Sequence, residues 1–600
     1  MSQDQLQARP DLLGWFGMCS STHWTASATG QSVLERGGNA FDAAVAAAFV
    51  LHVVEPHLNG PGGDLVALAA PADGEPVTVV GQGPAPAGAT IERFREEGLD
   101  LVPGAGALAA AIPGAVDAWL MLLRDYGTWE VGAVLEPAIE YARRGHALLP
   151  KAADTIAGVA DLFRDHWPTS ADLWLVDGAV PHAGSIVRNP TYARTLERLV
   201  AAERGQTREE RIDAVRREWR EGFVAEEIDR FVSSTPHMHA SGTVHRGVLA
   251  YEDLARHQAT YERPVRGTFR GYDVLKAGPW SQGPMLLQTL AILDGFDDED
   301  LDLNTAAGVH RVLEALKLAL ADRDTYYGAD VAPDVLEHLL SPEYARERRR
   351  LITDRASLEL RPGDLDGGRQ FLPPLREAYR AEAAAASTGE PTVSAVGAVR
   401  GDTCHLDVVD RWGNMVSATP SGGWLQSSPT IPALGFALGT RLQMTWLDPR
   451  SPAALRPGAR PRTTLTPSLL ARDGHVVAAF GSPGGDQQDQ WQAGFLVRML
   501  VGGMTPQQAI EAPAFHTTSF PNSFWPRTWT PGGAVVEDRL GDDVIADLEL
   551  RGHRVARAGD WALSRLTAVT RDARTGLVGA AANSRSSCCR CSARSGSCAS

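Results

Sequence analysis

Cysteine is scarce in this 600-residue sequence until its end. Only Cys19 and Cys404 precede the cluster "CCRCSARSGSC", which begins at Cys588 and lies in the last thirteen residues. So few cysteines exclude a disulfide framework and are typical of a reduced compartment. The terminal cluster has no histidine partner and no pair of C-x-x-C motifs, so we predict no metal site there. The abrupt change of composition after "GLVGAAAN" predicts a disordered tail over residues 584–600.

Excess positive charge and long apolar runs are also missing. The formal net charge is -16, so a nucleic-acid partner is not expected. The longest apolar run, "AAVAAAFVLHVV" at Ala43 to Val54, is shorter than the roughly 20 residues that a membrane-spanning helix needs. The start "MSQDQLQARPDLLGWFG" lacks the basic residues and apolar core of a secretory signal. We therefore expect a soluble, cytoplasmic protein with no membrane partner.

The patterns that are present indicate a large α+β protein. The stretch "GGNAFDAAVAAAFVLHVVEPHLNGPGGD" predicts a helix with Asn39 as its N-cap and Asp42 in its first turn. Apolar residues near a 3.6-residue period predict a second helix after Asn304. Short β-branched runs with glycine turns predict strands in the C-terminal third, in "CHLDVVDRWGNMVSAT", "HVVAAFGSPGG" and "LTAVTRDARTGLVGAA".

The clearest break in the chain lies at residues 380–402, "RAEAAAASTGEPTVSAVGAVRGD". Its small and polar residues have little to bury, which predicts an exposed, mobile linker. The linker runs directly into a predicted strand that begins with Thr403. A self-cleaving precursor needs this arrangement, because a cut between Asp402 and Thr403 makes the threonine a new N-terminus. The predicted fragments are residues 1–402 and 403–600.

Several residues at this junction are candidate nucleophiles or bases. On an extended strand Thr403, His405 and Asp407 share one face, and Cys404 lies on the other. We therefore predict that Cys404 is a small buried hydrophobe rather than the partner of His405. Same-face neighbours sit roughly 6.6 Å apart, so we expect no relay along the row. A free Thr403 amine, with a reference pKa of ~7.7 to 8.0, is an alternative base, although a strand threonine that only packs is the ordinary interpretation.

The stretch "AAFGSPGGDQQDQW" supplies candidate donors for an oxyanion. An apolar strand ends at Gly481, and Gly484 and Gly485 precede a predicted helix. Paired glycines let backbone N–H groups turn inward beside a helix start, although a plain strand-to-helix turn is the alternative. No Gly-Lys-Ser/Thr follows and G-x-G-x-x-G is absent, so a nucleotide site is weakly supported and no cofactor is predicted.

Taken in order, these segments resemble the gamma-glutamyltranspeptidase family of N-terminal-nucleophile hydrolases. The similarity runs from about Thr22 to Asn583. Besides the first helix, the "DTCH" junction and "GSPGG", it rests on "IPGAVDAW", "YEDLARHQATYERPVRGTFRGYDVL", "PWSQGPMLLQTLAIL", "HRVLEALKLALADRDTYYG" and "PGARPRTTLTP".

The resemblance implies a four-layer αββα sandwich that cleaves itself between Asp402 and Thr403. The large and small subunits would stay together, and a dimer of such heterodimers remains open. By position, Thr403 matches the nucleophile and its amine the base, and Ser421 matches the hydroxyl residue that contacts this amine. Further matches are the oxyanion-hole glycines, Gly484 and Gly485, and the hydroxyl pair that binds the substrate carboxylate, Thr463 and Thr464.

The sequence departs from the family where a glutamyl group would be held. The carboxylate-binding arginine is replaced by Ile91, with Arg93 two residues away. Gly423 stands near the family's asparagine, and Trp446 near its amino-binding aspartate, whereas Gln443 is retained. An unpaired ammonium or carboxylate is costly to bury, so we predict a retuned acyl pocket. We expect Trp424 and Trp446 to make it larger or more apolar.

Three functions remain open from the sequence. The first is an amidase or acylase of this type, acting on a small amide, with glutamyl transfer as its nearest variant. The second is a binding relative that keeps the fold without cleaving. The third is a nucleotide-dependent α/β enzyme, for which the phosphate loop is missing.

Overall fold

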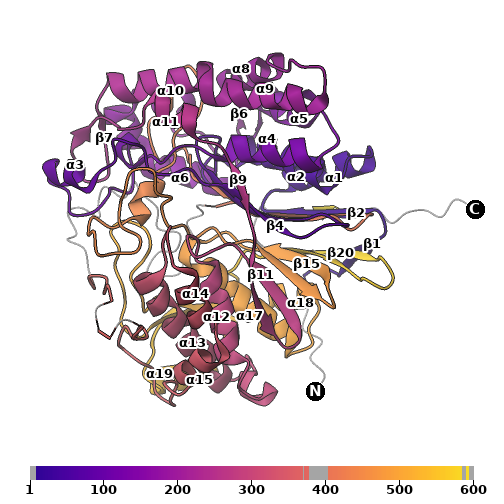
Figure 1. Ribbon diagram of the computed structural model, residues 1–600, viewed down its shortest axis with the longest axis vertical. Helices are drawn as coiled ribbons and strands as arrows, with labels where there is room; N and C mark the ends of the chain where they lie inside the picture. Colours follow the sequence, from indigo (N-terminus) through magenta and orange to yellow (C-terminus); the bar gives the residue numbers. More distant parts are fainter. Residues whose placement is uncertain (1–7, 366, 369, 378–402, 584–589, 593–600) are drawn as a thin grey trace, which may run out of the picture.

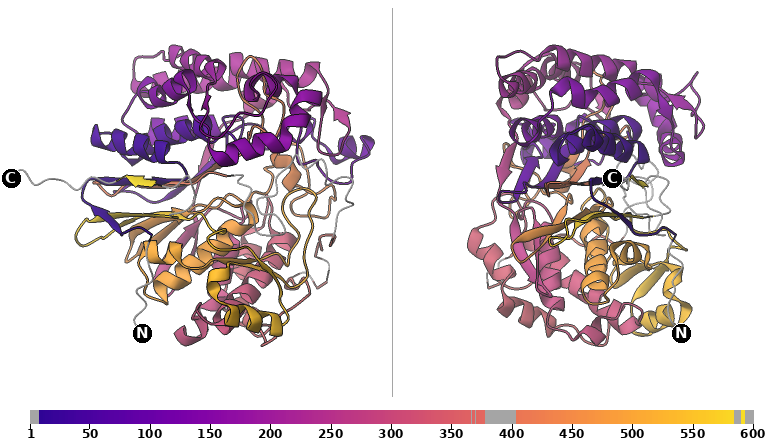
Figure 2. Two further views of the ribbon diagram at one scale, coloured as in Figure 1. Left: turned by 180° about the vertical axis from the view of Figure 1, so that it is seen from behind. Right: turned by 90° about the vertical axis from the view of Figure 1, so that its right-hand side faces the viewer.

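Two seven-stranded antiparallel sheets lie face to face at the centre of the molecule (Figures 1 and 2). The computed structural model describes residues 8–365, 367–368, 370–377, 403–583 and 590–592. In order, the first sheet contains β1 (Leu12–Gly14), β20 (Val578–Ala582), β19 (Thr567–Arg571), β15 (His475–Gly481), β14 (Ser468–Arg472), β11 (Tyr272–Lys276) and β10 (Val265–Phe269). The second contains β21 (Arg590–Ser592), β2 (Gly17–Ser21), β12 (Leu406–Asp410), β13 (Met415–Ser421), β3 (Asp64–Ala70), β4 (Val77–Gly81) and β9 (Thr260–Glu262). We call them the β15 sheet and the β12 sheet.

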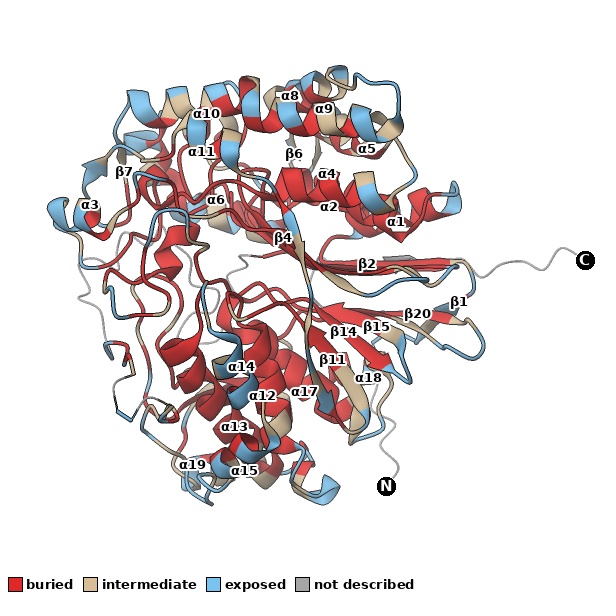
Figure 3. Cartoon of the chain, viewed as in Figure 1, coloured by how far each residue is buried: buried red, intermediate tan, exposed pale blue. Residues whose placement is uncertain are grey.

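Helices cover the outer face of each sheet, so the inner helices and the strands are buried while the outermost helices are partly exposed (Figure 3). On the β12 sheet lie α1 (Trp24–Glu35), α2 (Ala40–Val54), α4 (Ala115–Tyr126), α5 (Val131–Arg144), α8 (Pro190–Ala201), α9 (Arg208–Glu221) and α10 (Phe223–Ser234). On the β15 sheet lie α12 (Gly283–Leu293), α13 (Ala306–Tyr326), α15 (Pro342–Arg349), α17 (Gln488–Leu500), α18 (Pro506–Glu511) and α19 (Asp542–Leu550). The sequence therefore forms the mixed helix and sheet structure that its patterns predict.

Helix α2 begins where the sequence predicts. The Asn39 side chain accepts from the Phe41 and Asp42 amides, and Asp42 accepts in return from the Asn39 amide. Every residue of α2 is buried, and its small alanines let it pack closely against α1 and the β12 sheet. The helix ends at Glu55, where a Pro/Gly-rich loop leads into β3. The helix predicted after Asn304 is α13, and Thr305 is its N-cap.

The space between the sheets is apolar at one end and polar at the other. Met18, Val409 and Leu469 belong to the apolar core between the sheets. Towards the start of β12, Asp407 instead accepts a 2.6 Å hydrogen bond from Thr567 of the facing sheet. Ser417 of β13 likewise donates to the Phe480 carbonyl of β15 at 3.0 Å. Polar cross-links therefore fix the two sheets at the end where the predicted nucleophile lies.

Parts of the sequence predictions fall outside the described residues. The linker 380–402, including Asp402, is one of them. Of the predicted tail, residues 590–592 form β21 and pair with β2, and the rest of 584–600 is not described. Among the described helices, none combines the length and apolar character needed to cross a bilayer.

Candidate active site

Thr403 lies at the polar end of the β12 sheet, three residues before β12 begins. It forms an isolated antiparallel bridge with Ser421, the last residue of β13. The two side-chain oxygens are 3.1 Å apart, and both residues are buried. The next amide, that of Cys404, donates to the Pro420 carbonyl at 3.0 Å. The structure thus brings Ser421 to the side chain of Thr403, whereas the predicted contact of Ser421 with a free Thr403 amine stays a prediction.

His405 and Asp407 share the face of Thr403, but they bond to other partners. His405 Nδ1 lies 2.9 Å from Thr419 Oγ1, and His405 Nε2 lies 2.9 Å from Asp407 Oδ1. The assumption that same-face neighbours are too far apart for contact is wrong for this pair, because the imidazole ring reaches along the strand. Both ring nitrogens of His405 bond to residues other than Thr403, so His405 is not positioned as a base for the threonine, in line with the expectation of no relay.

Cys404 points to the opposite face of the strand, towards the end of α2. Its sulfur donates to Glu55 Oε2 at 3.0 Å, and Asn59 Nδ2 lies 3.1 Å from the same sulfur. Thr22 also donates to Glu55 Oε2, at 2.6 Å. The prediction of a small buried hydrophobe is therefore wrong in part, because Cys404 is buried in a polar cluster. This cluster lies on the opposite side of the Thr403–Asp407 segment from the Thr403 side chain.

The predicted glycine turn follows β15. Gly484 has φ of 123° and Gly485 has φ of 53°, a region that favours residues without a Cβ. Asp486 fixes the turn from behind, because its carboxylate accepts from the Ser523 amide at 2.8 Å and pairs with Arg323. To other residues of the described ranges, the Gly484 and Gly485 amides donate no hydrogen bond. They are therefore available as donors to a bound group.

The two strands fix where this turn lies relative to Thr403. Phe480 of β15 bonds to Ser417, and a Cβ at Gly481 would lie 2.3 Å from the His405 ring. Passing from Phe480 to Gly481 therefore moves towards the start of β12. The chain continues in that direction into the Gly484 turn, which places the turn at the Thr403 end of the interface.

The predicted hydroxyl pair lies in the loop before β14, at the edge of the same space. Thr463 forms a bridge to Ser281, and its amide donates to the Trp280 carbonyl at 2.9 Å. Thr464 is fully buried, and its Oγ1 has no hydrogen-bond partner among the described residues. A buried hydroxyl without a partner is costly unless a ligand supplies one. Thr464 is thus the better-supported member of the pair.

The other predicted substrate-binding residues are largely occupied by protein contacts. Gln443 Nε2 donates to Thr440 Oγ1 at 2.9 Å, and Gln443 Oε1 accepts from the Trp525 amide at 3.3 Å. The Trp446 ring packs against Arg527, whose guanidinium lies 4.0 Å from the ring centroid. Arg93 lies on α3 (Ile91–Glu96), where its side chain is 40% exposed and pairs with Glu97, while its Nε is buried without a hydrogen-bond partner among the described residues.

Sequence reasoning missed Arg441, which lies close to this centre. Its Nε donates to Asp64 Oδ2 at 2.7 Å, and its Nη2 has no partner among the described residues. Asp64 pairs in register with Ser421. Burial raises the pKa of the Asp64 carboxyl, and the Arg441 charge opposes this shift. No local spacing signals the pair, because the two residues are 377 positions apart.

Behind the glycine turn lies a buried charged cluster with an excess of one positive charge. Its members are three arginines and two aspartates: Arg323, Arg462, Arg527, Asp324 and Asp486. Burial and the neighbouring guanidiniums lower the pKa of Arg462 to about 10 and that of Arg527 to about 9. Both side chains therefore stay protonated near neutral pH, and the cluster favours negative charge at the turn.

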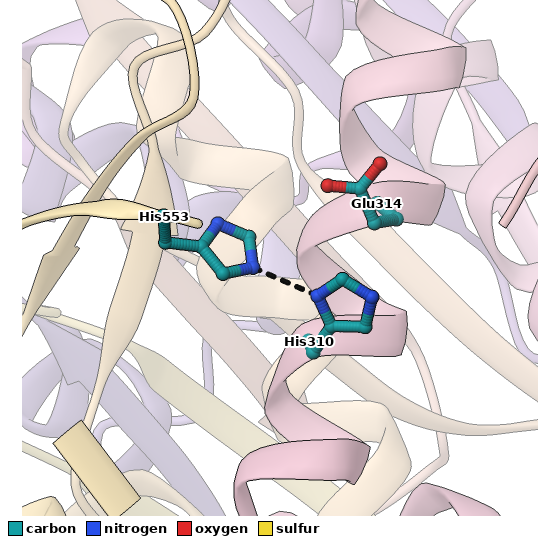
Figure 4. A group of neighbouring side chains, drawn as sticks. All are labelled: His310, Glu314 and His553. Carbon is teal, nitrogen blue, oxygen red and sulfur yellow. Dashed lines mark hydrogen bonds between the residues drawn. The ribbon is translucent and has the colours of Figure 1, made fainter. Parts of the chain in front are cut away.

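A second buried polar cluster lies away from Thr403, on α13 and the segment before β18 (Arg554–Arg557) (Figure 4). Side chains of His310, Glu314 and His553 approach closely enough to share an ion. However, Glu314 already accepts from Lys317 at 2.7 Å and from Arg361 at 2.9 Å. His310 bonds to His553 at 2.9 Å through Nδ1. A cation would add to the two charges that already neutralise the carboxylate, so we assign this cluster a structural role.

Comparisons with known proteins identify the family of this chain. The sequence model of gamma-glutamyltranspeptidase matches residues 26–589. The chain is 30% identical to the glutathione hydrolase-like YwrD proenzyme of Bacillus subtilis, over 92% of this chain and 93% of that protein. Among solved structures, LmbA2991HD is 50% identical with a TM-score of 0.91, covering 98% of this chain and 100% of that chain. Cephalosporin acylase from Bacillus halodurans is 27% identical with a TM-score of 0.81, covering 100% and 99%.

The matched range includes Thr403, the Gly484 turn, Thr463 and Thr464. The relatives carry names of both glutathione hydrolases and acylases. On these grounds, the chain belongs to the gamma-glutamyltranspeptidase family.

Proposed function

We propose that this protein is an N-terminal-threonine amidohydrolase or acyltransferase with the αββα architecture of N-terminal-nucleophile hydrolases. It would cut itself between Asp402 and Thr403 and then act on a small amide through the new terminal threonine. The observation that carries the proposal is the Thr403 hydroxyl, 3.1 Å from Ser421 Oγ, at the end of the sheet interface that the Gly484 turn also reaches. His405, the nearest imidazole in sequence, bonds elsewhere, so the α-amine is the remaining local base.

The chemistry follows from these groups. The Thr403 amine, with a reference pKa of ~7.7 to 8.0, accepts the hydroxyl proton while Oγ1 forms a bond to the amide carbon. The resulting oxyanion accepts hydrogen bonds from the Gly484 and Gly485 amides. The C–N bond then breaks, and the proton passes from the ammonium to the leaving amine. An ester to Thr403 remains, which water hydrolyses or an acceptor amine converts into a new amide.

Two acyl classes compete for this site, a γ-glutamyl group and an acyl group without the α-ammonium. We favour the second, as in an acylase. Ile91 is buried in an apolar cluster, and the Trp446 ring packs against Arg527. Neither side chain carries a charge that could pair with the carboxylate or the ammonium of a glutamyl group. An ammonium buried without a carboxylate partner would be costly. The γ-glutamyl reading remains the alternative, because the family includes glutathione hydrolases.

Two measurements test the proposal. Denaturing electrophoresis with N-terminal sequencing should give two fragments that divide between Asp402 and Thr403, and incubation with an anilide substrate should add the acyl mass to the fragment 403–600. A single intact chain would instead support a binding protein. We further expect a glutaryl anilide to have a higher kcat/KM than the γ-glutamyl anilide. A clear preference for γ-glutamyl would restore ordinary transpeptidase specificity.

A further inference from the structure

We propose that Lys276 and Asp489 are positioning residues, whose buried ion pair holds the Gly484 turn where its amides can bind the oxyanion. This inference rests on the proposed function, because it concerns the donors that would stabilise acyl transfer to Thr403. Neither side chain would touch the substrate, and both would act through the backbone of the turn.

The first observation is an ion pair in the interior of the molecule. Lys276 is the last residue of β11, and Asp489 lies in the first turn of α17. Their charged atoms, Nζ and Oδ1, are 2.9 Å apart, and both side chains are 0% exposed. Burying two opposite charges costs free energy that their attraction recovers only in part, and apolar residues of similar volume are often as stable. Stability alone therefore does not account for a charged pair at this place.

The second observation is that the pair joins three segments of the chain. The Lys276 ammonium also donates to three other groups, the Thr466 carbonyl at 3.0 Å, Ser468 Oγ at 2.7 Å and Gln492 Oε1 at 3.2 Å. Thr466 Oγ1 in turn donates to Asp489 Oδ1 at 2.8 Å. The start of α17 is thereby fixed to the end of β11 and to the segment that leads from Thr464 into β14.

The third observation is that α17 and the glycine turn are continuous. Gly485 begins a 3-10 helix, η4 (Gly485–Gln487), which runs directly into α17. The Gln282 side chain, six residues after Lys276, donates to the Gly485 carbonyl at 3.3 Å. The segment that carries the lysine therefore holds the turn as well as the helix. A shift of α17 would move the turn amides relative to Thr403, which lies beside the other sheet.

Such a shift matters because oxyanion stabilisation depends on exact placement. Donors act when they lie about 2.7–3.1 Å from the developing charge. A misplacement of about 1 Å can lower the rate by roughly 100-fold. The alternative is a purely structural ion pair that only stabilises the half of the molecule around the β15 sheet. The two roles differ in whether the rate per active site follows the stability of the protein.

Asp489→Asn tests the positioning role, because asparagine keeps the shape and one acceptor but removes the charge. Glu314→Gln is the matched control, since Glu314 is also a buried carboxylate, 2.7 Å from the Lys317 ammonium. Active-site titration gives rates per acylated Thr403. Butylboronic acid is the probe of the turn, because its tetrahedral adduct on Thr403 would present a negative oxygen as the transition state does.

We expect Asp489→Asn to lower kcat by about 10- to 100-fold and to weaken inhibition by butylboronic acid by a similar factor, with KM changed by less than about 3-fold. Glu314→Gln should leave kcat, KM and this inhibition unchanged. A loss of folded protein lowers the number of titrated sites, but it does not change the inhibition constant of the sites that remain.

The double variant Lys276→Met with Asp489→Asn separates positioning from stability. It removes the unpaired charge, so the temperature of thermal unfolding should return towards that of the wild type while kcat stays low. Recovery of kcat together with stability would overturn the inference, as would an Asp489→Asn variant with wild-type kcat and boronate inhibition. Either result would leave the acyl-Thr403 proposal intact.

Should Asp489→Asn fail to fold or to cleave itself, Thr466→Val decides, because it removes only the hydroxyl that donates to Asp489. A lower kcat with parallel loss of boronate inhibition supports positioning, and unchanged values refute it. The proposed function would fail in a different way. Wild-type protein would then show neither Thr403-dependent anilide hydrolysis nor binding of butylboronic acid, and the positioning inference would be refuted with it.

Discussion

Two buried polar clusters of this protein differ in how completely their donors and acceptors are satisfied. Around α13, the Glu314 carboxylate is matched by Lys317, Arg361 and the Ser357 amide. Around Thr403, by contrast, Arg441 Nη2, Thr464 Oγ1 and the glycine-turn amides have no partner within the described residues. Glu314, Thr403, Arg441 and Thr464 are all buried. Burial alone therefore does not distinguish the two clusters, and neither does a single unmatched atom, since His553 Nδ1 of the α13 cluster also has no partner among the described residues. The difference lies in the charged groups: both oxygens of Glu314 are paired, whereas Arg441 Nη2 is not bonded within the described residues.

Unmatched groups cost stability, which a fold tolerates only where they serve another purpose. The α13 cluster should consequently respond to substitution by losing stability. The Thr403 cluster should respond by losing activity. The following substitutions test this division, beginning with the largest expected effect.

Thr403→Ala should abolish self-processing and lower amide hydrolysis by at least about 1,000-fold, because one hydroxyl is proposed to attack both the Asp402 carbonyl and the substrate. Thr403→Ser should keep part of both activities. Electrophoresis and anilide assays measure these effects, and thermal unfolding should show a folded protein. Normal hydrolysis by the alanine variant would move the nucleophile to another residue.

Gly484→Ala should lower kcat by about 100- to 1,000-fold, as expected for a lost oxyanion donor. At φ of 123°, a side chain strains the turn, and its Cβ would lie 2.5 Å from the Trp491 ring. Gly503→Ala is the matched control, because Gly503 also has a positive φ but nothing within 4 Å of an added Cβ. Equal losses of kcat in the two variants would show a general folding effect and remove the turn from catalysis.

Glu314→Gln should destabilise the protein by about 3 kcal/mol, because Lys317 would keep a buried charge without its carboxylate. Activity per folded molecule should stay the same. Urea unfolding and active-site titration on one preparation distinguish the two quantities. Should the variant remain stable but lose kcat, the α13 cluster would belong to the functional machinery and the division between the clusters would collapse.

Cys404→Ala should have the smallest effect. Turnover should change by less than about 3-fold, and stability by about 1 kcal/mol, since the Cys404 hydrogen bond to Glu55 and the Asn59 hydrogen bond to its sulfur are removed. Cys404→Ser should restore the donor and part of this stability. A loss of processing in the alanine variant would mean that the polar cluster behind the strand positions Thr403.

The sequence was informative where the physical signal is local. The cap at Asn39, the strand that starts near Thr403 and the glycine turn at Gly484 each depend on a few adjacent residues, and the structure contains all three. Alternation along the strand also separated Cys404 from His405, although it did not foresee the contact of His405 with Asp407. Short-range patterns therefore predicted both the elements and much of the site.

Long-range pairing could not be predicted in this way. Arg441 and Asp64 meet only because β3 lies beside β13 and η3 (Arg441–Met444) folds back over it, and no spacing in the sequence encodes that meeting. Arg93 was predicted from its proximity in sequence to Ile91; in the structure it pairs with Glu97 on the same helix, so a role at the site stays a prediction. A side chain's neighbours across a sheet, rather than along the chain, decide its chemistry.

The position of β12 determines how a cleaved molecule would unfold and refold. This strand lies inside its sheet, flanked by β2 on one side and β13 on the other, and β13 in turn pairs with β3. A cut before Thr403 would leave strands of both fragments paired within one sheet, so neither fragment could dissociate without unfolding the core. Because the cut removes the peptide bond between the two fragments, unfolding would let them separate. Refolding would then require two chains to meet, so it would be bimolecular and would depend on concentration. A processed molecule would thus fold once as one chain and persist afterwards by kinetic rather than equilibrium stability.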